Sequence, residues 1–184
     1  MAYGVSLWFD RFSEDTIRSI WKALHEEGLS SFLWKGSFRP HVTLVIYETI
    51  DLVRLTAALN ETLSQIAPFN LSFPSFGCFV GPPDEVSVSE NAVVLNVTPT
   101  MQLLDFHARV HQLLSEYGTS PRPYDLPGQW NPHSTVAREV KRNSIPEILH
   151  VCHRFILPIN ATVNRIGVID TPAEVELECC PLAG

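Results

Sequence analysis

Pro40-His41-Val42-Thr43-Leu44 and Pro132-His133-Ser134-Thr135-Val136 are two versions of one short sequence, far apart in a chain of 184 residues. Each copy places a histidine directly after a proline, a threonine two residues later and an aliphatic residue after that. Alternate side chains of an extended strand point to the same face, so each copy presents one imidazole beside one hydroxyl. The repeat therefore predicts two strands that carry the same pair of reactive groups.

The duplication favours a shared catalytic site over coincidence. A single His-x-Thr is expected by chance in a chain with seven histidines, and a lone histidine on a strand is more often structural. The other five histidines lack the matching flanks. Two converging imidazoles would act as a general base and a general acid, while two hydroxyls would bind the oxygens of the displaced group. A phosphate diester fits this arrangement.

Residues 39–44 and 131–138 resemble the tandem signatures of the two-histidine (2H) phosphoesterase superfamily, which includes plant-type cyclic nucleotide phosphodiesterases and bacterial RNA 2′,5′-ligase-like enzymes. The resemblance implies an α+β fold with two pseudo-symmetric lobes, each an antiparallel sheet with helices on its outer face. The active-site cleft would lie between the lobes, within one bilobal phosphoesterase domain over residues 1–184. The second copy departs from the family pattern because Ser134 occupies the hydrophobic position.

The predicted reaction is metal-independent hydrolysis of a cyclic phosphodiester, with His41 and His133 catalytic and Thr43 and Thr135 binding phosphate. One neutral imidazole would deprotonate water, and the opposite imidazolium would protonate the departing ribose oxygen. Histidine suits both roles because its ordinary pKa is about 6.5. The hydroxyls would donate to the non-bridging oxygens as charge builds there. We expect no metal and no cofactor, and the resemblance implies a 2′-phosphomonoester product.

Candidate substrates are a nucleoside 2′,3′-cyclic phosphate, an ADP-ribose cyclic phosphate and an RNA end with a 2′,3′-cyclic phosphate. A 2′,5′-RNA ligase or phosphodiesterase, and a noncatalytic module that binds RNA ends, are the alternatives. The net charge of −7 disfavours long nucleic acid, which is bound by neutralising many phosphates. A small nucleotide or one RNA end is therefore the expected ligand, and we expect a monomer.

Composition describes a folded protein, with 45% hydrophobic and 18% charged residues. No apolar run reaches the length of a membrane span, and no signal peptide is evident, so we expect no membrane association and a cytoplasmic location. The four cysteines, without CxxC spacing, are expected to be buried or free thiols.

Aromatic and basic residues near the motifs are candidates for binding the rest of the substrate. Alternation places Tyr47 on the face of His41, and the loop before His133 contains Tyr124 and Trp130. Arg138 follows the second motif. The competing interpretation is that these residues pack in the core or are solvated. Further candidates of the same kinds are Phe38, Arg39 and Arg122.

His107 and His111 lie four residues apart on one predicted helix, as metal ligands can. Neither this pair nor the pair formed by His150 and His153 has a clear third ligand. A surface or interhelix role is therefore expected for both pairs.

Periodicity predicts helices with N-caps at Ser13, Asp51, Thr98 and Ser144, the first ending before Gly28. Strands are predicted at residues 3–9, 41–47, 70–80, 85–89, 92–98, 132–138, 156–169 and 174–179, with a proline-rich loop at 119–131. In the strand 41–47, the face opposite His41 would comprise Val42, Leu44 and Ile46 and pack on the helix that begins at Asp51. The order strand, helix, motif strand, helix occurs twice, which indicates an internal duplication.

Overall fold

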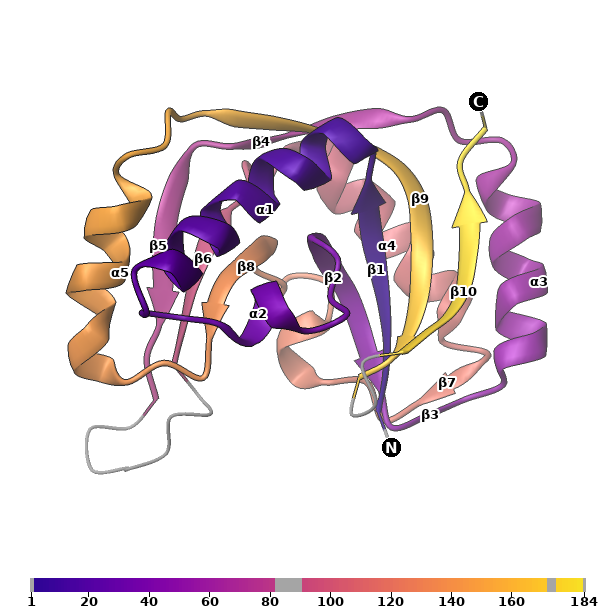
Figure 1. Cartoon of the computed structure of the whole chain (residues 1–184). Helices are drawn as coiled ribbons and strands as arrows, with labels where there is room; N and C mark the ends of the chain where they lie inside the picture. Colours follow the sequence, from indigo (N-terminus) through magenta and orange to yellow (C-terminus); the bar gives the residue numbers. More distant parts are fainter. Residues whose placement is uncertain (1, 82–90, 172–174, 184) are drawn as a thin grey trace.

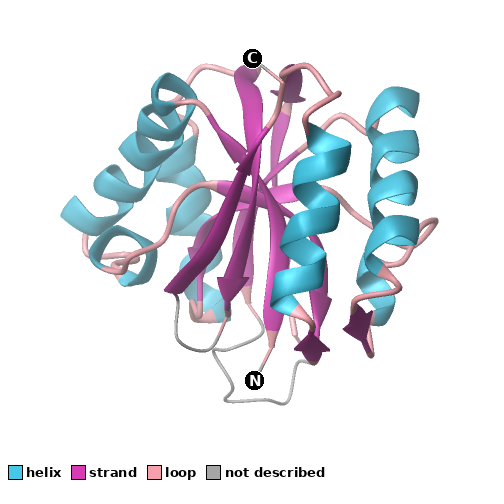
Figure 2. Cartoon of the chain, turned by 90° about the vertical axis from the view of Figure 1, so that its right-hand side faces the viewer, coloured by secondary structure: helices cyan, strands magenta, loops and turns pink. Residues whose placement is uncertain are grey.

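Antiparallel strands lie at the centre of the computed structural model, which describes residues 2–81, 91–171 and 175–183, and helices flank them on both sides (Figures 1 and 2). The order of the larger sheet is β10-β9-β1-β2, with β4 also paired to β9, and that of the second sheet is β5-β6-β8. A two-stranded sheet, β3-β7, lies apart. The strands are β1 (Tyr3–Phe9), β2 (His41–Tyr47), β3 (Thr49–Ile50), β4 (Phe69–Phe73), β5 (Ser75–Phe79), β6 (Ala92–Asn96), β7 (Gly118–Thr119), β8 (His133–Arg138), β9 (Ile159–Asp170) and β10 (Val175–Pro181).

The helices cover the outer faces of the two sheets, which confirms the predicted α+β architecture. On one side α5 packs on β5 and β6, and on the other α3 packs on β10 (Figure 1). Their bounds are α1 (Arg11–Glu26), α2 (Phe32–Lys35), α3 (Leu52–Leu63), α4 (Met101–Leu114) and α5 (Ile145–Cys152), with short 3₁₀ turns η2 (Pro123–Asp125) and η3 (Arg142–Ser144).

Each predicted motif strand is confirmed, and both are edge strands. β2 ends the larger sheet and β8 ends the second sheet, and the two strands contact each other in the middle of the molecule (Figure 1). An edge strand leaves half of its backbone groups outside the ladder. The two motifs therefore meet through strand edges that are free to accept other contacts.

Helices are exchanged between the two halves of the chain. α1, from the first half, packs on β8, whereas α4, from the second half, packs on β2. The prediction that the helix beginning at Asp51 would cover β2 is wrong, because α3 packs mainly on β10. Periodicity identified the apolar stripe of α3 correctly, but it carries no information about which sheet the stripe covers.

Two N-caps differ from those predicted. Asp10 caps α1 by accepting from the Ser13 amide at 2.8 Å, and Ser13 is buried, with its hydroxyl accepting from the Thr162 amide at 3.1 Å. Thr100, not Thr98, caps α4. In both cases the true cap lies within three residues of the predicted one, where two polar residues compete for the same role. The cap at Asp51 is confirmed, and Ser144 occupies the N-cap position of α5 without a capping bond from its side chain.

The predicted strand at 70–80 is divided in the structure. Pro74 separates β4, which pairs with β9, from β5, which pairs with β6, so that one apolar run supplies both sheets. Proline lacks the amide needed to continue a ladder. The predicted strand at 85–89 lies outside the described residues.

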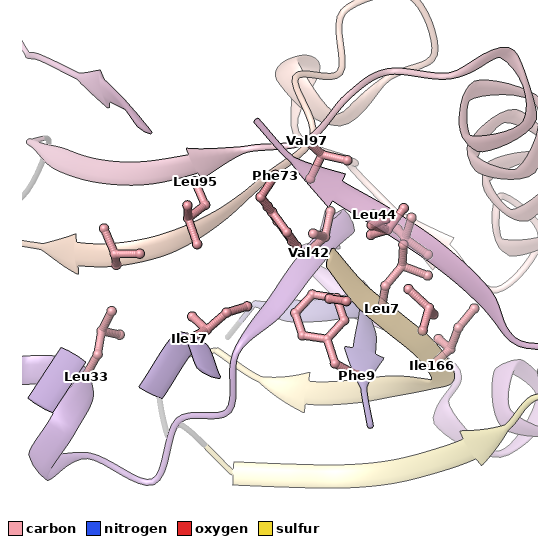
Figure 3. Close-up of a cluster of buried hydrophobic side chains, with 14 of the residues drawn as sticks. Leu7, Phe9, Ile17, Leu33, Val42, Leu44, Phe73, Leu95, Val97 and Ile166 are labelled. Carbon is pink, nitrogen blue, oxygen red and sulfur yellow. The ribbon is translucent and has the colours of Figure 1, made fainter. Parts of the chain in front are cut away.

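One hydrophobic core joins the two sheets. Leu7, Phe9 and Val42 lie together in Figure 3, and each is 0% exposed. Phe9 also contacts Phe73 edge to face, with ring centroids 5.9 Å apart. Burying a side chain of this size contributes roughly 1.5–3 kcal/mol to folding. The core therefore fixes the relative position of the motif strands.

None of the helices in the described part of the chain is both long and apolar enough to cross a bilayer. All four cysteines are free thiols, as expected: Cys152 and Cys180 are buried, Cys179 is half-buried and Cys78 is exposed.

Gly167 leaves room for an aromatic ring beside the motif. A Cβ atom at this position would lie 1.9 Å from the indole of Trp8, which pairs across the ladder with His41. We predict that Gly167→Ala lowers the free energy of unfolding by roughly 1–3 kcal/mol, as overpacking does. Urea unfolding checks this. The control is Gly4→Ala, where the nearest atom is a side-chain methyl at 3.1 Å. An equal loss of unfolding free energy in both variants would contradict the role of Gly167 in making room for Trp8.

Candidate active site

Both motif strands contain a β-bulge directly after the threonine. In β2 the ladder pairs Thr43 and Val45 with neighbouring residues of β1, so Leu44 is the extra residue. In β8 it pairs Thr135 and Ala137 with neighbouring residues of β6, so Val136 is extra. A bulge opposes two residues to one and bends the strand. The resemblance between the two motifs thus extends from sequence to backbone geometry.

The bulges change which side chains share the face of the histidines. Strict alternation predicts Tyr47 on the face of His41, but the extra residue shifts the alternation by one, and Ile46 faces the cavity instead. The position corresponding to Ile46 in β8 is Arg138, which also lines the cavity. Tyr47 is 1% exposed and packs at the core, so the expectation that it binds substrate beside His41 is wrong.

Each catalytic candidate is held by the same hydrogen bond. His41 Nδ1 lies 2.7 Å from the carbonyl oxygen of Arg39, and His133 Nδ1 lies 2.7 Å from that of Asn131. A carbonyl oxygen only accepts, so both Nδ1 atoms carry the proton and donate. Nε2 is therefore the nitrogen of each ring that remains available to a substrate.

Burial lowers the pKa of both histidines below the ordinary value. For His41 this effect is opposed by its bond to the Arg39 carbonyl and reinforced by the nearby charges of His133 and Arg138. For His133, burial lowers the pKa and the bond to Asn131 opposes it. Two imidazoles whose charges interact titrate as a coupled pair. The free site therefore favours neutral rings near neutral pH.

A cavity of about 500 Å³ adjoins the motifs. His41, Thr43 and Thr135 line it, together with Arg122 and Arg138. The Arg138 guanidinium lies 3.1 Å from a Glu139 carboxylate oxygen. Concave sites of this volume are typical for small ligands. The structure thus brings both threonines and one histidine of the predicted set to one cavity.

His133 is not among the residues that line this cavity. It begins β8 two residues before Thr135, is half-buried and packs edge-on against Phe79, with ring centroids 4.8 Å apart. Burial is the main cause of the lowered pKa of His41, and the charge of His133 lowers it further. The periodicity of β5 gave no indication that Phe79 would contact the second motif.

The remaining sequence candidates lie in different places. Tyr124 is 73% exposed in η2 and does not line the cavity, because the 3₁₀ turn directs it to solvent. Trp130 packs inward, stacked on His107 with ring centroids 4.0 Å apart, and its indole donates to the Thr43 carbonyl at 2.9 Å. Phe38 lines the cavity. Stacking of Tyr124 or Trp130 on a base is not supported by these positions.

Arg39 has a structural environment despite lining the cavity. Its guanidinium lies 2.6 Å from a carboxylate oxygen of Glu14, 3.5 Å from one of Glu176, and 4.8 Å from the centroid of Trp8. These contacts hold the segment whose carbonyl orients His41. The backbone of Arg39 thus orients His41, a role that the sequence did not indicate.

Ser134, the departure from the family pattern, is 1% exposed. Its hydroxyl is buried without a hydrogen-bond partner in the described structure. Ser134 therefore occupies the motif position that is usually apolar, and its side chain is buried on the side of β8 away from the cavity.

His107 and His111 lie beside each other on α4, with ring centroids 5.9 Å apart. Within the described ranges no group of three or more potential ligands is close enough to hold an ion. His107 is 2% exposed, and its Nε2 donates to the carbonyl of Leu44, the bulge residue, at 3.0 Å. The expected interhelix or surface role is thus replaced by a contact between helix and motif strand.

Comparison with known proteins places this geometry in a family. The family model of the 2′-5′ RNA ligase superfamily matches residues 14–173, which is most of the chain. The chain therefore belongs to the 2′-5′ RNA ligase superfamily, whose members are phosphoesterases of the two-histidine class. Among curated proteins no sequence match is found.

Solved structures share the fold at low sequence identity. TT0787 of Thermus thermophilus is 16% identical with a TM-score of 0.59, covering 100% of this chain and 99% of its own. LigT of E. coli complexed with NADP⁺ is 12% identical with a TM-score of 0.56, covering 99% and 98%. Usb1 of Kluyveromyces marxianus is 11% identical with a TM-score of 0.52, covering 98% of each chain. The likeness extends over both sheets and their helices.

Buried histidines predict an acid-sensitive fold. Burial lowers the pKa of His41, His107, His111 and His133, so the unfolded chain binds more protons than the native one below about pH 6.5. We predict that the free energy of unfolding falls between pH 7 and pH 5, by up to about 1.4 kcal/mol per pH unit for each group. Urea unfolding across this range checks it. His107→Gln, which keeps a donor for the Leu44 carbonyl, should flatten the dependence; an unchanged slope would contradict the role of His107.

Proposed function

We propose that this protein hydrolyses a cyclic phosphodiester, without a metal ion, by paired histidine acid–base catalysis. The observation that carries the proposal is the matched orientation of His41 and His133, each with Nδ1 donating to a carbonyl two residues upstream. This arrangement leaves Nε2 of each ring to act on the substrate. The family assignment supports a phosphoesterase, and the paired geometry supports the finer mechanism.

His41 acts as the base and His133 as the acid. The Arg138 guanidinium disfavours protonation of His41, and both residues line the cavity, whereas His133 does not, so we assign the proton to His133. A bound anionic phosphate raises the pKa of both rings, because an opposite charge favours the protonated form. His41 then removes a proton from water as its oxygen attacks phosphorus, and His133 protonates the ribose oxygen that leaves.

Thr43 and Thr135 bind the non-bridging oxygens. Both line the cavity, and each follows its histidine by two residues on the same face of the strand. Hydroxyl donors placed where negative charge develops stabilise the transition state more than the ground state. Arg122 and Arg138 add positive charge at the cavity.

The substrate is a small nucleotide or a single RNA end: a nucleoside 2′,3′-cyclic phosphate, an ADP-ribose cyclic phosphate or an RNA 2′,3′-cyclic end. The net charge of −7 opposes binding of long nucleic acid, whereas the arginines at the cavity suit one or two phosphates. Opening to a 2′-phosphomonoester, a cytoplasmic location and a monomeric state complete the proposal.

Joining or cleavage of 2′,5′-linked RNA is the second candidate. The family description, 2′-5′ RNA ligase superfamily, favours it, and the same two histidines and threonines would serve it. Assaying cyclic nucleotides beside 2′,5′-linked RNA separates the candidates. Binding of RNA ends without turnover of either substrate would leave the noncatalytic alternative.

Removal of either histidine should reduce turnover strongly. We predict that His41→Ala and His133→Ala each lower kcat on a 2′,3′-cyclic nucleotide by roughly 10²–10⁴-fold, as expected for loss of a general acid or base. Thr43→Val and Thr135→Val should have smaller effects. Steady-state kinetics measures these changes, and circular dichroism verifies the fold. Near-normal turnover in either histidine variant would refute the paired mechanism.

The pH dependence tests the mechanism independently of mutation. We predict a bell-shaped rate profile with two apparent pKa values that belong to the coupled pair. Because the proposed mechanism uses no metal ion, the pH–rate profile measured with EDTA should match the profile measured without it. Inactivation by EDTA that added metal reverses, or a profile with one limb, would be inconsistent with two working imidazoles.

A further inference from the structure

Two tryptophans donate hydrogen bonds to equivalent backbone atoms, one in each motif. The indole nitrogen of Trp130 lies 2.9 Å from the carbonyl oxygen of Thr43, and that of Trp21 lies 3.1 Å from the carbonyl oxygen of Thr135. Each tryptophan belongs to the opposite half of the chain from the motif that it contacts. The two phosphate-binding candidates thus share one backbone environment, built from unrelated segments.

These carbonyls belong to edge strands, and each directly precedes the extra residue of a bulge. β2 and β8 are edge strands, so a carbonyl on their outer side has no partner in the ladder. In addition, the next residue in each strand is the extra residue of the bulge, Leu44 or Val136. A bulge interrupts regular pairing and increases local twist. Without another contact, the peptide group after each threonine would be weakly oriented.

Trp130 is itself rigidly held. Its ring is stacked on that of His107 with an interplanar angle of 4° and a centroid distance of 4.0 Å. His107 is 2% exposed and donates to the Leu44 carbonyl. One stacked pair therefore binds two consecutive carbonyls, those of Thr43 and Leu44, across the bulge of β2.

Trp21 is held by the core of the other sheet. It is 3% exposed within the apolar stripe of α1, the helix that packs on β8. The guanidinium of Arg18 lies 5.6 Å from its ring centroid. The position of the Thr135 carbonyl is thus tied to a helix rather than to a mobile side chain.

We infer that Trp21 and Trp130 are positioning residues that orient the hydroxyls of Thr135 and Thr43 for transition-state binding. Fixing the carbonyl fixes the peptide plane beside the threonine Cα, and this sets the direction of the side chain. The inference rests on the proposed function, in which both hydroxyls donate to the phosphoryl oxygens. Neither tryptophan lines the cavity, so each acts through its threonine.

The test replaces the indole N–H while keeping an aromatic ring. Trp130→Phe and Trp21→Phe should each lower kcat on a 2′,3′-cyclic nucleotide by about tenfold, with KM changed by less than about twofold, because misplaced groups lose transition-state binding first. Trp34→Phe is the matched control. Its indole makes no hydrogen bond in the described structure, and its ring lies 5.3 Å from the Arg18 guanidinium.

Double-mutant cycles identify the threonine through which each tryptophan acts. Trp130→Phe should have little further effect in a Thr43→Val background and its full effect in a Thr135→Val background. Trp21→Phe should show the opposite pattern. A tryptophan that merely stabilises the fold would lower the melting temperature without producing this crossed pattern. Additive effects in all four combinations would overturn the inference.

A second variant guards against misfolding. Replacement of either tryptophan by 3-benzothienylalanine removes the donor and retains the bicyclic shape, so the same loss of kcat is expected. Unchanged kcat in these isosteric variants, measured well below the melting temperature, would overturn the inference.

The outcome is separable from that of the proposed function. A wild-type protein that hydrolyses no cyclic phosphate would refute the proposed function alone. Calorimetric binding of orthovanadate, which adopts the five-coordinate geometry of the transition state, then tests the positioning role, since the same hydroxyls would bind its oxygens. Weaker binding by the Trp130 and Trp21 variants, but not by the Trp34 variant, supports the inference. Equal affinities, or no measurable binding by wild type, would overturn it.

Discussion

One extra residue in each motif strand determines which side chains reach the cavity. After Thr43 and after Thr135 the ladder opposes two residues to one, so the regular alternation of the strand shifts there. The shift brings Ile46 and Arg138 to the cavity and sends Tyr47 to the core. The side chains that line the cavity after each His-x-Thr motif are therefore determined by the bulge that follows the threonine.

Elements from one half of the chain pack on or pair with elements from the other half, and this holds the two sheets together. α1 packs on β8, α4 packs on β2, and the long strand β9 pairs with both β4 and β1 (Figure 1). A continuous core lies beneath them (Figure 3). Close packing allows little independent movement of such elements. Elements from both halves of the chain consequently hold the two motif strands in a fixed relation.

Electrostatics at the cavity differ from those of the whole chain. The net charge is −7, yet Arg122 and Arg138 line the cavity, and Arg39 is bound by the carboxylates of Glu14 and Glu176. A small anion would therefore meet basic side chains at the cavity despite the negative net charge of the chain. Burial lowers the pKa of both histidines, so the arginines supply the positive charge beside the cavity near neutral pH.

The sequence by itself determined the family, the fold class and both motif strands with their His-x-Thr repeat, because each is encoded locally: a repeated motif, period-two alternation and apolar stripes at helical spacing. It identified Arg138, but not the reason that this residue reaches the cavity. Only the tertiary structure decided the burial of Tyr47, the helix that covers β2, and the backbone contacts of Trp21, Trp130 and His107. Bulges arise from the pairing of two strands, and an indole finds a carbonyl only after helices have packed, so neither leaves a periodic signal along the chain.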